Sequence, residues 1–97
     1  MSAAAKRYLG LIHRLPCVVC LYAYGKRVRA AEAHHLEHVR GEHSDFATIP
    51  LCHACHDGLH QSHRRAFYLA HKLDDIKLLA LTNQLLLKHY EDCAYAI

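Results

Sequence analysis

The 97-residue chain lacks any long hydrophobic run. Residues 1–10 carry Lys6 and Arg7 after a short alanine stretch, and Pro16 follows early, so we expect neither a secretion signal nor a membrane span. Repeats, linkers and low-complexity segments are lacking as well. A chain of this length therefore predicts one domain, residues 1–97.

The number of cysteines is odd, at five, so a disulfide framework would leave one of them over. Disulfides also belong mainly to oxidising compartments. We therefore expect reduced thiols and a cytoplasmic setting. The formal charge of +3 counts every cysteine as neutral, and thiolates on a metal ion would change it, so the total charge neither favours nor excludes nucleic acid as a partner.

Four of the cysteines form two Cys-x2-Cys pairs, Cys17 with Cys20 and Cys52 with Cys55. The two-residue gap lets one tight turn direct both thiolates at one ion, and two such pairs supply the ligands of a closed tetrahedral zinc site. Buried free thiols or a redox pair are the alternatives. Because the apolar core of so small a domain gives marginal stability alone, we expect zinc to supply much of the folding free energy.

Histidines form a second candidate set of ligands. His56 and His60 are four residues apart, so on a helix both imidazoles leave the same face, although solvent-facing histidines or a zinc-finger variant would also fit. His34 or His35 can supply a third ligand. Neighbouring side chains of a strand point to opposite faces, so only one of these two can bind the ion, and the other stays available to move protons.

Apolar spacing and turn residues predict the order of the elements. A helix over residues 3–14, a knuckle at 17–20, a strand or irregular arm at 21–24, strands within 31–39 and 46–51, a loop at 40–45, and helices over 55–71 and 74–90 are expected. Tyr22 and Tyr24 are expected to be packing residues rather than base-stacking platforms. The result is an α+β domain with its core at about 16–63 and its C-terminal helix at about 74–90.

Two surface features bear on partners. Leucines form a broad stripe on the last helix, which would support a homodimer, at Leu78, Leu79, Leu81, Leu85, Leu86 and Leu87. Basic residues cluster beside the candidate sites, at Arg27, Arg29, Arg40, Arg64 and Arg65. These arginines are either an ordinary solvated surface or a track that binds the phosphates of DNA.

Two segments together resemble a known family: Ala33-His34-His35-Leu36, and Ile49-Pro50-Leu51-Cys52-x2-Cys55-His56. The chain resembles HNH endonucleases of the ββα-metal (His-Me finger) superfamily in their four-cysteine form, most of all the small phage recombination-enhancement nucleases. The resemblance covers residues 16–63. It implies a ββα-metal core with a treble-clef-like zinc site and flanking N- and C-terminal helices, together with a role in phage recombination and a recombinase partner.

Residue by residue, the resemblance implies that His34, His56 and His60 hold a catalytic divalent ion. The adjacent His35 would be the general base that takes a proton from the attacking water, since a neutral imidazole can accept a proton and a metal-bound nitrogen cannot. Imidazole ligands suit Zn²⁺, Ni²⁺ or Mn²⁺, and Mg²⁺ is often used by the superfamily.

The chain departs from the family pattern at one point: the central Asn is missing between His35 and Cys52. Asp45 is the candidate for its role, either by bracing the loop or by holding the imidazole of His35 in the useful tautomer. We therefore expect a metal-dependent DNA endonuclease that hydrolyses phosphodiester bonds. A non-catalytic, zinc-stabilised module that binds nucleic acid or protein is the alternative, and the missing Asn is the feature that favours it.

Overall fold

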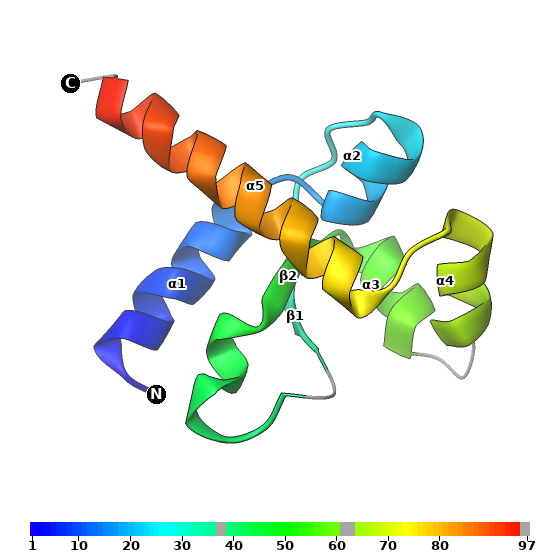
Figure 1. Cartoon of the computed structure of the whole chain (residues 1–97), viewed down its shortest axis with the longest axis horizontal. Coiled ribbons are helices and arrows are strands. Elements are labelled where there is room, and N and C mark those ends of the chain that lie inside the picture. The colour runs from blue at the N-terminus through cyan, green and yellow to red at the C-terminus, as the bar shows by residue number, and fades with distance from the viewer. Residues whose placement is uncertain (37–38, 61–63, 96–97) are drawn as a thin grey trace.

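The computed structural model describes residues 1–36, 39–60 and 64–95, without the side chains of residues 60, 64 and 92–95. Its elements in chain order are α1 (Ala3–Arg14), α2 (Val18–Tyr24), β1 (Glu32–His35), the 3-10 helix η1 (Gly41–Phe46), β2 (Thr48–Leu51), α3 (His53–His60), α4 (Arg64–His71) and α5 (Asp75–Tyr95). This is a small α+β fold, the class that the sequence predicts (Figure 1). Within the described parts of the chain, no helix combines the length and the apolarity that a membrane-spanning segment needs.

β1 and β2 form a two-stranded antiparallel sheet in which His34 lies opposite Ile49 and His35 opposite Thr48. All four residues of β2 are buried. On β1 the side chains alternate as strand geometry requires, because His34 is 4% exposed whereas the side chain of His35 is 48% exposed. The two neighbouring histidines therefore face different surroundings. Most of the stretch predicted as a loop at 40–45 forms the 3-10 helix η1, which also includes Phe46, so the second strand begins at Thr48 rather than at residue 46.

The core gathers around β2, which packs against α1, α2, α3 and α5. Its buried members include Val18, Ile49, Leu51, Leu59 and Leu78. Figure 1 shows α5 as a long helix running across the molecule over this centre. The sheet and the two helices that carry cysteines, α2 and α3, thus pack against a common core. This packing fixes the orientation of the histidine and cysteine side chains that they carry.

α2 corrects the prediction of a strand or irregular arm at residues 21–24. The helix forms because Val18 and Val19 are buried against the core, a tertiary effect that outweighs the strand preference of nearby tyrosines. It ends at Gly25, which has a φ of 65° and donates its N–H to backbone carbonyls of the preceding turn. Tyr22 and Tyr24 lie on this helix and are 46% and 59% exposed. The Tyr22 ring contacts Lys77 of α5, and the Tyr24 ring meets that of His71 of α4 edge-on, so both pack against neighbouring helices at the surface rather than in the core.

Two packed helices, α3 and α4, replace the single helix predicted over residues 55–71. A Cβ atom placed on Gly58 of α3 would meet the ring of Phe67 of α4 at 3.0 Å. In one continuous helix these residues would be separated by roughly 13 Å along the axis, too far for such contact. α3 and α4 are therefore two helices packed against each other rather than one continuous helix, and residues 61–63 lie outside the described residues.

α5 has the leucine stripe predicted for the last helix, and it extends to Tyr95 rather than residue 90. Leu78 is fully buried, and several of the other leucines are partly buried against the core: Leu79, Leu81 and Leu85. Leu87 is 61% exposed. Most of the stripe is thus in contact with the chain's own core, and its outer edge remains on the surface.

Candidate metal centre and histidine cluster

The two Cys-x2-Cys pairs are built in the same way. Cys17 precedes α2 and Cys20 lies in its first turn, whereas Cys52 follows β2 and Cys55 lies in the first turn of α3. The first cysteine of each pair accepts a backbone hydrogen bond at its carbonyl, from Leu21 and His56 respectively. Each helix start thus presents two sulfur atoms in one direction.

The four sulfur atoms converge within 4.8 Å of one another. The Sγ atom of Cys20 lies 3.8 Å from that of Cys52 and 3.8 Å from that of Cys55. Four thiolates at the usual Zn–S distance of about 2.3 Å form a tetrahedron whose edges measure about 3.8 Å. The cysteines are therefore positioned to bind one metal ion, and their spacing and chemistry suit structural zinc.

These sulfur atoms also affect one another's protons. The hydrogen bond from the Cys55 thiol, helped by the backbone N–H groups of Cys20 and Cys52, lowers the pKa of Cys17 to about 5. Burial, followed by the neighbouring Cys17, raises the pKa of Cys20 to about 11. The hydrogen bond to Cys17, followed by burial, also raises the pKa of Cys55. An incoming ion would therefore displace protons from Cys20 and Cys55 at pH 7.

The histidine cluster lies on the sheet and on α3. The ring centroids of His34 and His56 are 5.1 Å apart, with the rings almost perpendicular. The Nδ1 atom of His56 is paired with the carboxylate of Glu32, which also lies near His53. Because a carboxylate accepts hydrogen bonds, Glu32 favours the form of His56 that carries its proton on Nδ1.

Glu32 is a site residue that the sequence reasoning missed. The signal was present, since Glu32 precedes His34 by two positions in a strand and side chains two apart share a face. His60, the third predicted histidine ligand, ends α3, but its side chain lies outside the described residues. The structure thus brings together His34, His56 and Glu32.

His35 points away from this cluster. Its Nε2 atom lies 2.9 Å from Oδ1 of Asp45, which is part of η1. The carboxylate can only accept this hydrogen bond, so Nε2 carries the proton and Nδ1 keeps its lone pair. Thr48 donates its hydroxyl hydrogen to the backbone carbonyl of Asp45 and so ties the same residue to β2.

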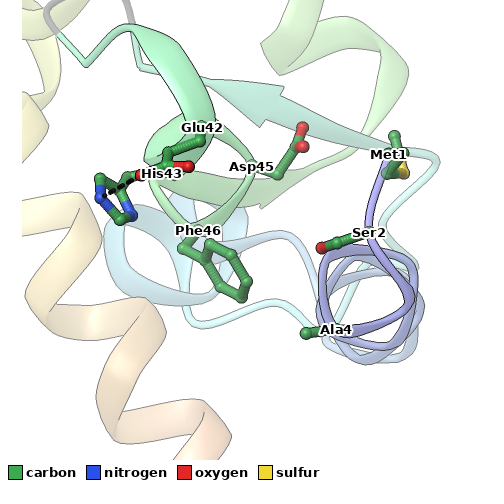
Figure 2. Close-up of a pocket in the computed structure, with 7 residues that line it drawn as sticks. All are labelled: Met1, Ser2, Ala4, Glu42, His43, Asp45 and Phe46. Atoms are coloured by element: carbon green, nitrogen blue, oxygen red, sulfur yellow. Dashed lines mark ion pairs between the residues drawn. The ribbon is translucent and has the colours of Figure 1, made fainter.

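Asp45 also lines a pocket of about 530 Å³ between η1 and the start of α1 (Figure 2). The ring of Phe46 in this pocket lies 5.2 Å from that of Tyr8 and holds η1 against α1. Glu42 is a second carboxylate in the lining.

The predicted arginines are dispersed. Arg27 and Arg29 follow α2, Arg40 precedes η1 and Arg65 lies on α4, and all four are exposed. The side chain of Arg64 lies outside the described residues.

Comparisons of the chain with protein-family models, with curated proteins and with solved structures gave no match. The functional argument therefore depends on the geometry of these two clusters.

Proposed function

We propose that the chain is a metal-dependent DNA endonuclease of the HNH type, which hydrolyses phosphodiester bonds. One observation carries the proposal: two adjacent histidines of β1 have different partners. The ring of His34 lies near the ring of His56 of α3, whereas His35 shares a hydrogen bond with Asp45 of η1. A hydrolytic site of this kind needs one imidazole to hold an ion and another to take a proton, and the alternation of a strand separates them.

The order of elements supports the same proposal. β1 and β2 are followed by α3, and the second cysteine pair lies at the junction of β2 and α3. We propose that this unit is a ββα-metal core with a treble-clef-like zinc site. The first cysteine pair, at the start of α2, supplies the other two sulfur atoms of the zinc site.

In the proposed reaction, His35 accepts the proton of the attacking water at Nδ1. Asp45 keeps the Nε2 proton in place and stabilises the imidazolium that forms. His35 is half exposed, so water and a phosphodiester can approach it. Asp45 thus lies in the loop that the Asn of the family pattern steadies, and as a carboxylate it adds a negative charge beside His35 that an amide would lack.

His34, His56 and His60 would hold the catalytic ion, which we propose to be Mg²⁺, Mn²⁺, Ni²⁺ or Zn²⁺. When bound, a divalent ion supplies positive charge that stabilises the negative charge building on the phosphate and on the leaving oxygen. Glu32 orients His56 through its Nδ1 atom, a common arrangement around metal-bound histidines. Of these three histidines, the structure describes the side chains of His34 and His56, whose rings lie 5.1 Å apart, and the His60 side chain lies outside the described residues.

We further propose that Arg27, Arg29, Arg40, Arg64 and Arg65 contact the DNA backbone. A part in phage recombination, with a recombinase partner, follows from the resemblance to the small phage nucleases, and a homodimer from the leucines of α5. The cleavage chemistry needs neither the recombinase nor the homodimer.

The test is cleavage of supercoiled plasmid by zinc-loaded protein, titrated with Mg²⁺, Mn²⁺, Ni²⁺ or Zn²⁺, beside the His35→Ala variant. We expect nicking that depends on the added ion and falls by about 100-fold or more in the variant, the size of a general-base contribution. Zinc content and circular dichroism should be the same for both proteins. Absence of nicking by folded, zinc-loaded wild-type protein would reject the endonuclease.

A non-catalytic, zinc-stabilised binding module is the second candidate. It is favoured by one observation: within the described residues, the four cysteines are the only group of three or more side chains placed to hold an ion. The two candidates differ in metal stoichiometry. The module binds one ion per chain, whereas the endonuclease binds a second, weaker ion whose affinity falls in a His56→Ala variant.

A further inference from the structure

A basic surface lies where the end of α1, the segment after α2 and the second half of α5 meet. Two hollows of about 110 and 440 Å³ share the lining residues Arg14, Leu15, Pro16 and Arg27. The first also includes Lys88, and the second includes Arg29. We call the four cations Arg14, Arg27, Arg29 and Lys88 the basic surface.

This surface carries a local excess of positive charge. Its four formal charges exceed the +3 of the entire chain, so the remaining residues are together slightly negative. No aspartate or glutamate lines either hollow. Within the described residues, none of the four cations is ion-paired with a carboxylate, so their positive potential is not neutralised locally.

The segment that carries Arg27 and Arg29 is fixed to the first cysteine pair. The backbone N–H of Cys17 donates to the carbonyl of Val28 at 2.7 Å, and Arg29 forms an antiparallel bridge with Pro16. Val28 packs against the core. Since alternate residues of an extended segment share a face, Arg27 and Arg29 both point outward, and both are exposed.

The other two cations come from two helices, α1 and α5. Arg14 is the last residue of α1, which places it beside Leu15 and Pro16. Lys88 follows Leu85 by three positions on α5, and Leu85 packs against the core, so the core sets the orientation of this part of the helix. Because three separate segments supply the charges, the surface exists only in the folded protein.

We propose that the basic surface binds the phosphate backbone of duplex DNA without reading its sequence. The inference rests on the proposed endonuclease, whose substrate class it names. The lining residues supply cations for phosphates, and their only rings are the imidazoles of His13 and His89, which offer an unpaired base a smaller stacking surface than Phe, Tyr or Trp. A duplex also presents phosphates at a higher linear density than a single strand, so it gains more from a cluster of cations.

The test measures binding by fluorescence anisotropy, with a fluorescein-labelled duplex oligonucleotide of mixed sequence and with its isolated single strand. All proteins carry His35→Ala and are zinc-loaded, so that binding is observed without cleavage. The variant is Arg14→Gln with Lys88→Gln, which keeps much of each side chain's length. The matched control is Lys6→Gln with Arg7→Gln, two exposed cations of α1 outside the basic surface.

We expect the Arg14/Lys88 variant to raise Kd for the duplex about tenfold or more and to reduce the salt slope of log K by about two units, one for each lost phosphate contact. The Lys6/Arg7 control should change Kd less than about twofold, because these residues do not touch the backbone. Zinc content and circular dichroism verify that both variants are folded.

Equal effects of the two variants would overturn the basic surface as a DNA site. Single-stranded DNA bound as tightly as the duplex would overturn the duplex assignment, and so would binding that is stronger to phosphatidylserine vesicles than to DNA. Plasmid nicking separates these failures from that of the endonuclease. If the wild type does not nick but the Arg14/Lys88 variant binds the duplex more weakly than the control, the endonuclease is rejected and the DNA-binding surface is supported. If the wild type nicks but the Arg14/Lys88 variant binds as the control does, the surface is rejected and the endonuclease is supported.

Discussion

The Nε2 atom of His35 and the Oδ1 atom of Asp45 lie 2.9 Å apart, which joins the end of β1 to η1 through one hydrogen bond. Under the proposed mechanism this bond fixes the imidazole with Nδ1 as the proton acceptor. Asp45→Asn keeps the size of the side chain but removes its charge, and an amide can also donate to Nε2 and so favour the wrong tautomer. We expect kcat for plasmid nicking to fall by about 10- to 100-fold, with little change in stability.

The matched control for this prediction is Glu42→Gln on the same 3-10 helix. Glu42 pairs with His43 at 3.5 Å, and both side chains are largely exposed. We expect this variant to nick at nearly the wild-type rate. An equal fall in kcat in the two variants would mean that the net negative charge of η1, rather than the contact between Asp45 and His35, affects the rate.

Removal of zinc should unfold the protein. The binding free energy of a structural zinc site is roughly 10–16 kcal/mol, which is as large as the total stability of a typical small domain. We therefore expect excess chelator, or the Cys52→Ser substitution, to abolish the helical circular dichroism signal together with zinc content. Cys93→Ser, which changes the cysteine outside the two pairs, should keep both. A Cys52→Ser protein that stays folded and zinc-loaded would contradict the structural site.

Gly58→Ala tests the contact between α3 and α4. Alanine improves helix propensity by about 1 kcal/mol, but its Cβ would lie 3.0 Å from the Phe67 ring, and overpacking costs about 1–3 kcal/mol. Because Phe67 packs against the core, the ring cannot move freely, and we expect a net loss of stability of about 1 kcal/mol. Chemical denaturation provides the measurement.

The same contact can be examined with a double-mutant cycle. Phe67→Leu removes most of the ring, so Gly58→Ala should become neutral or stabilising in that background. Additive losses in the double variant would show that Gly58 and Phe67 do not interact in the way described.

Lys72→Gly should stabilise the end of α4. Lys72 has a φ of 54°, a conformation that costs a residue with a Cβ about 1–2 kcal/mol, and part of this gain is offset by the greater freedom of glycine in the unfolded chain. Leu73 donates its N–H to the carbonyl of Tyr68 at this helix end. We expect unfolding free energy to rise by about 0.5–1 kcal/mol. Lys72→Ala removes the same side chain but keeps the Cβ, and it should show no such rise.

Local signals predicted some elements well. α1 begins after Ser2, whose hydroxyl accepts the Ala5 N–H, and ends before Pro16, so the predicted and observed bounds of residues 3–14 agree. The two strands and the α+β class were also predicted, since the His doublet and the buried β2 lie between clear turn residues. Each of these features depends mainly on neighbours in the sequence.

Tertiary contacts decided the elements that were predicted incorrectly. Residues 21–24 are helical because Val18 and Val19 are buried in the core. The apolar period of α3 continues into α4, so the sequence pattern did not show that these are two helices. The proximity of Gly58 and Phe67 was not visible in any local pattern. Spacing alone was therefore insufficient where a helix depends on packing.

The candidate sites also divide into those that sequence spacing predicted and those that only the folded chain shows. The four cysteines were predicted from spacing, and they converge in space. Glu32 was missed although its position in β1 offered a clue. Arg14 and Lys88 could not be associated with Arg27 and Arg29, because only the folded chain brings these three segments together.

Arg40 separates the two cysteine pairs along the chain, so one ion bound by all four cysteines would connect the segments before and after this residue. Arg40 is exposed and precedes η1, with one cysteine pair on its N-terminal side and the other on its C-terminal side. A trypsin cut after Arg40 would yield two peptides, each contributing two thiolates to one ion and one strand to the sheet. The ion would then act as a reversible cross-link between the fragments, and they would separate on a gel-filtration column only when a chelator is added.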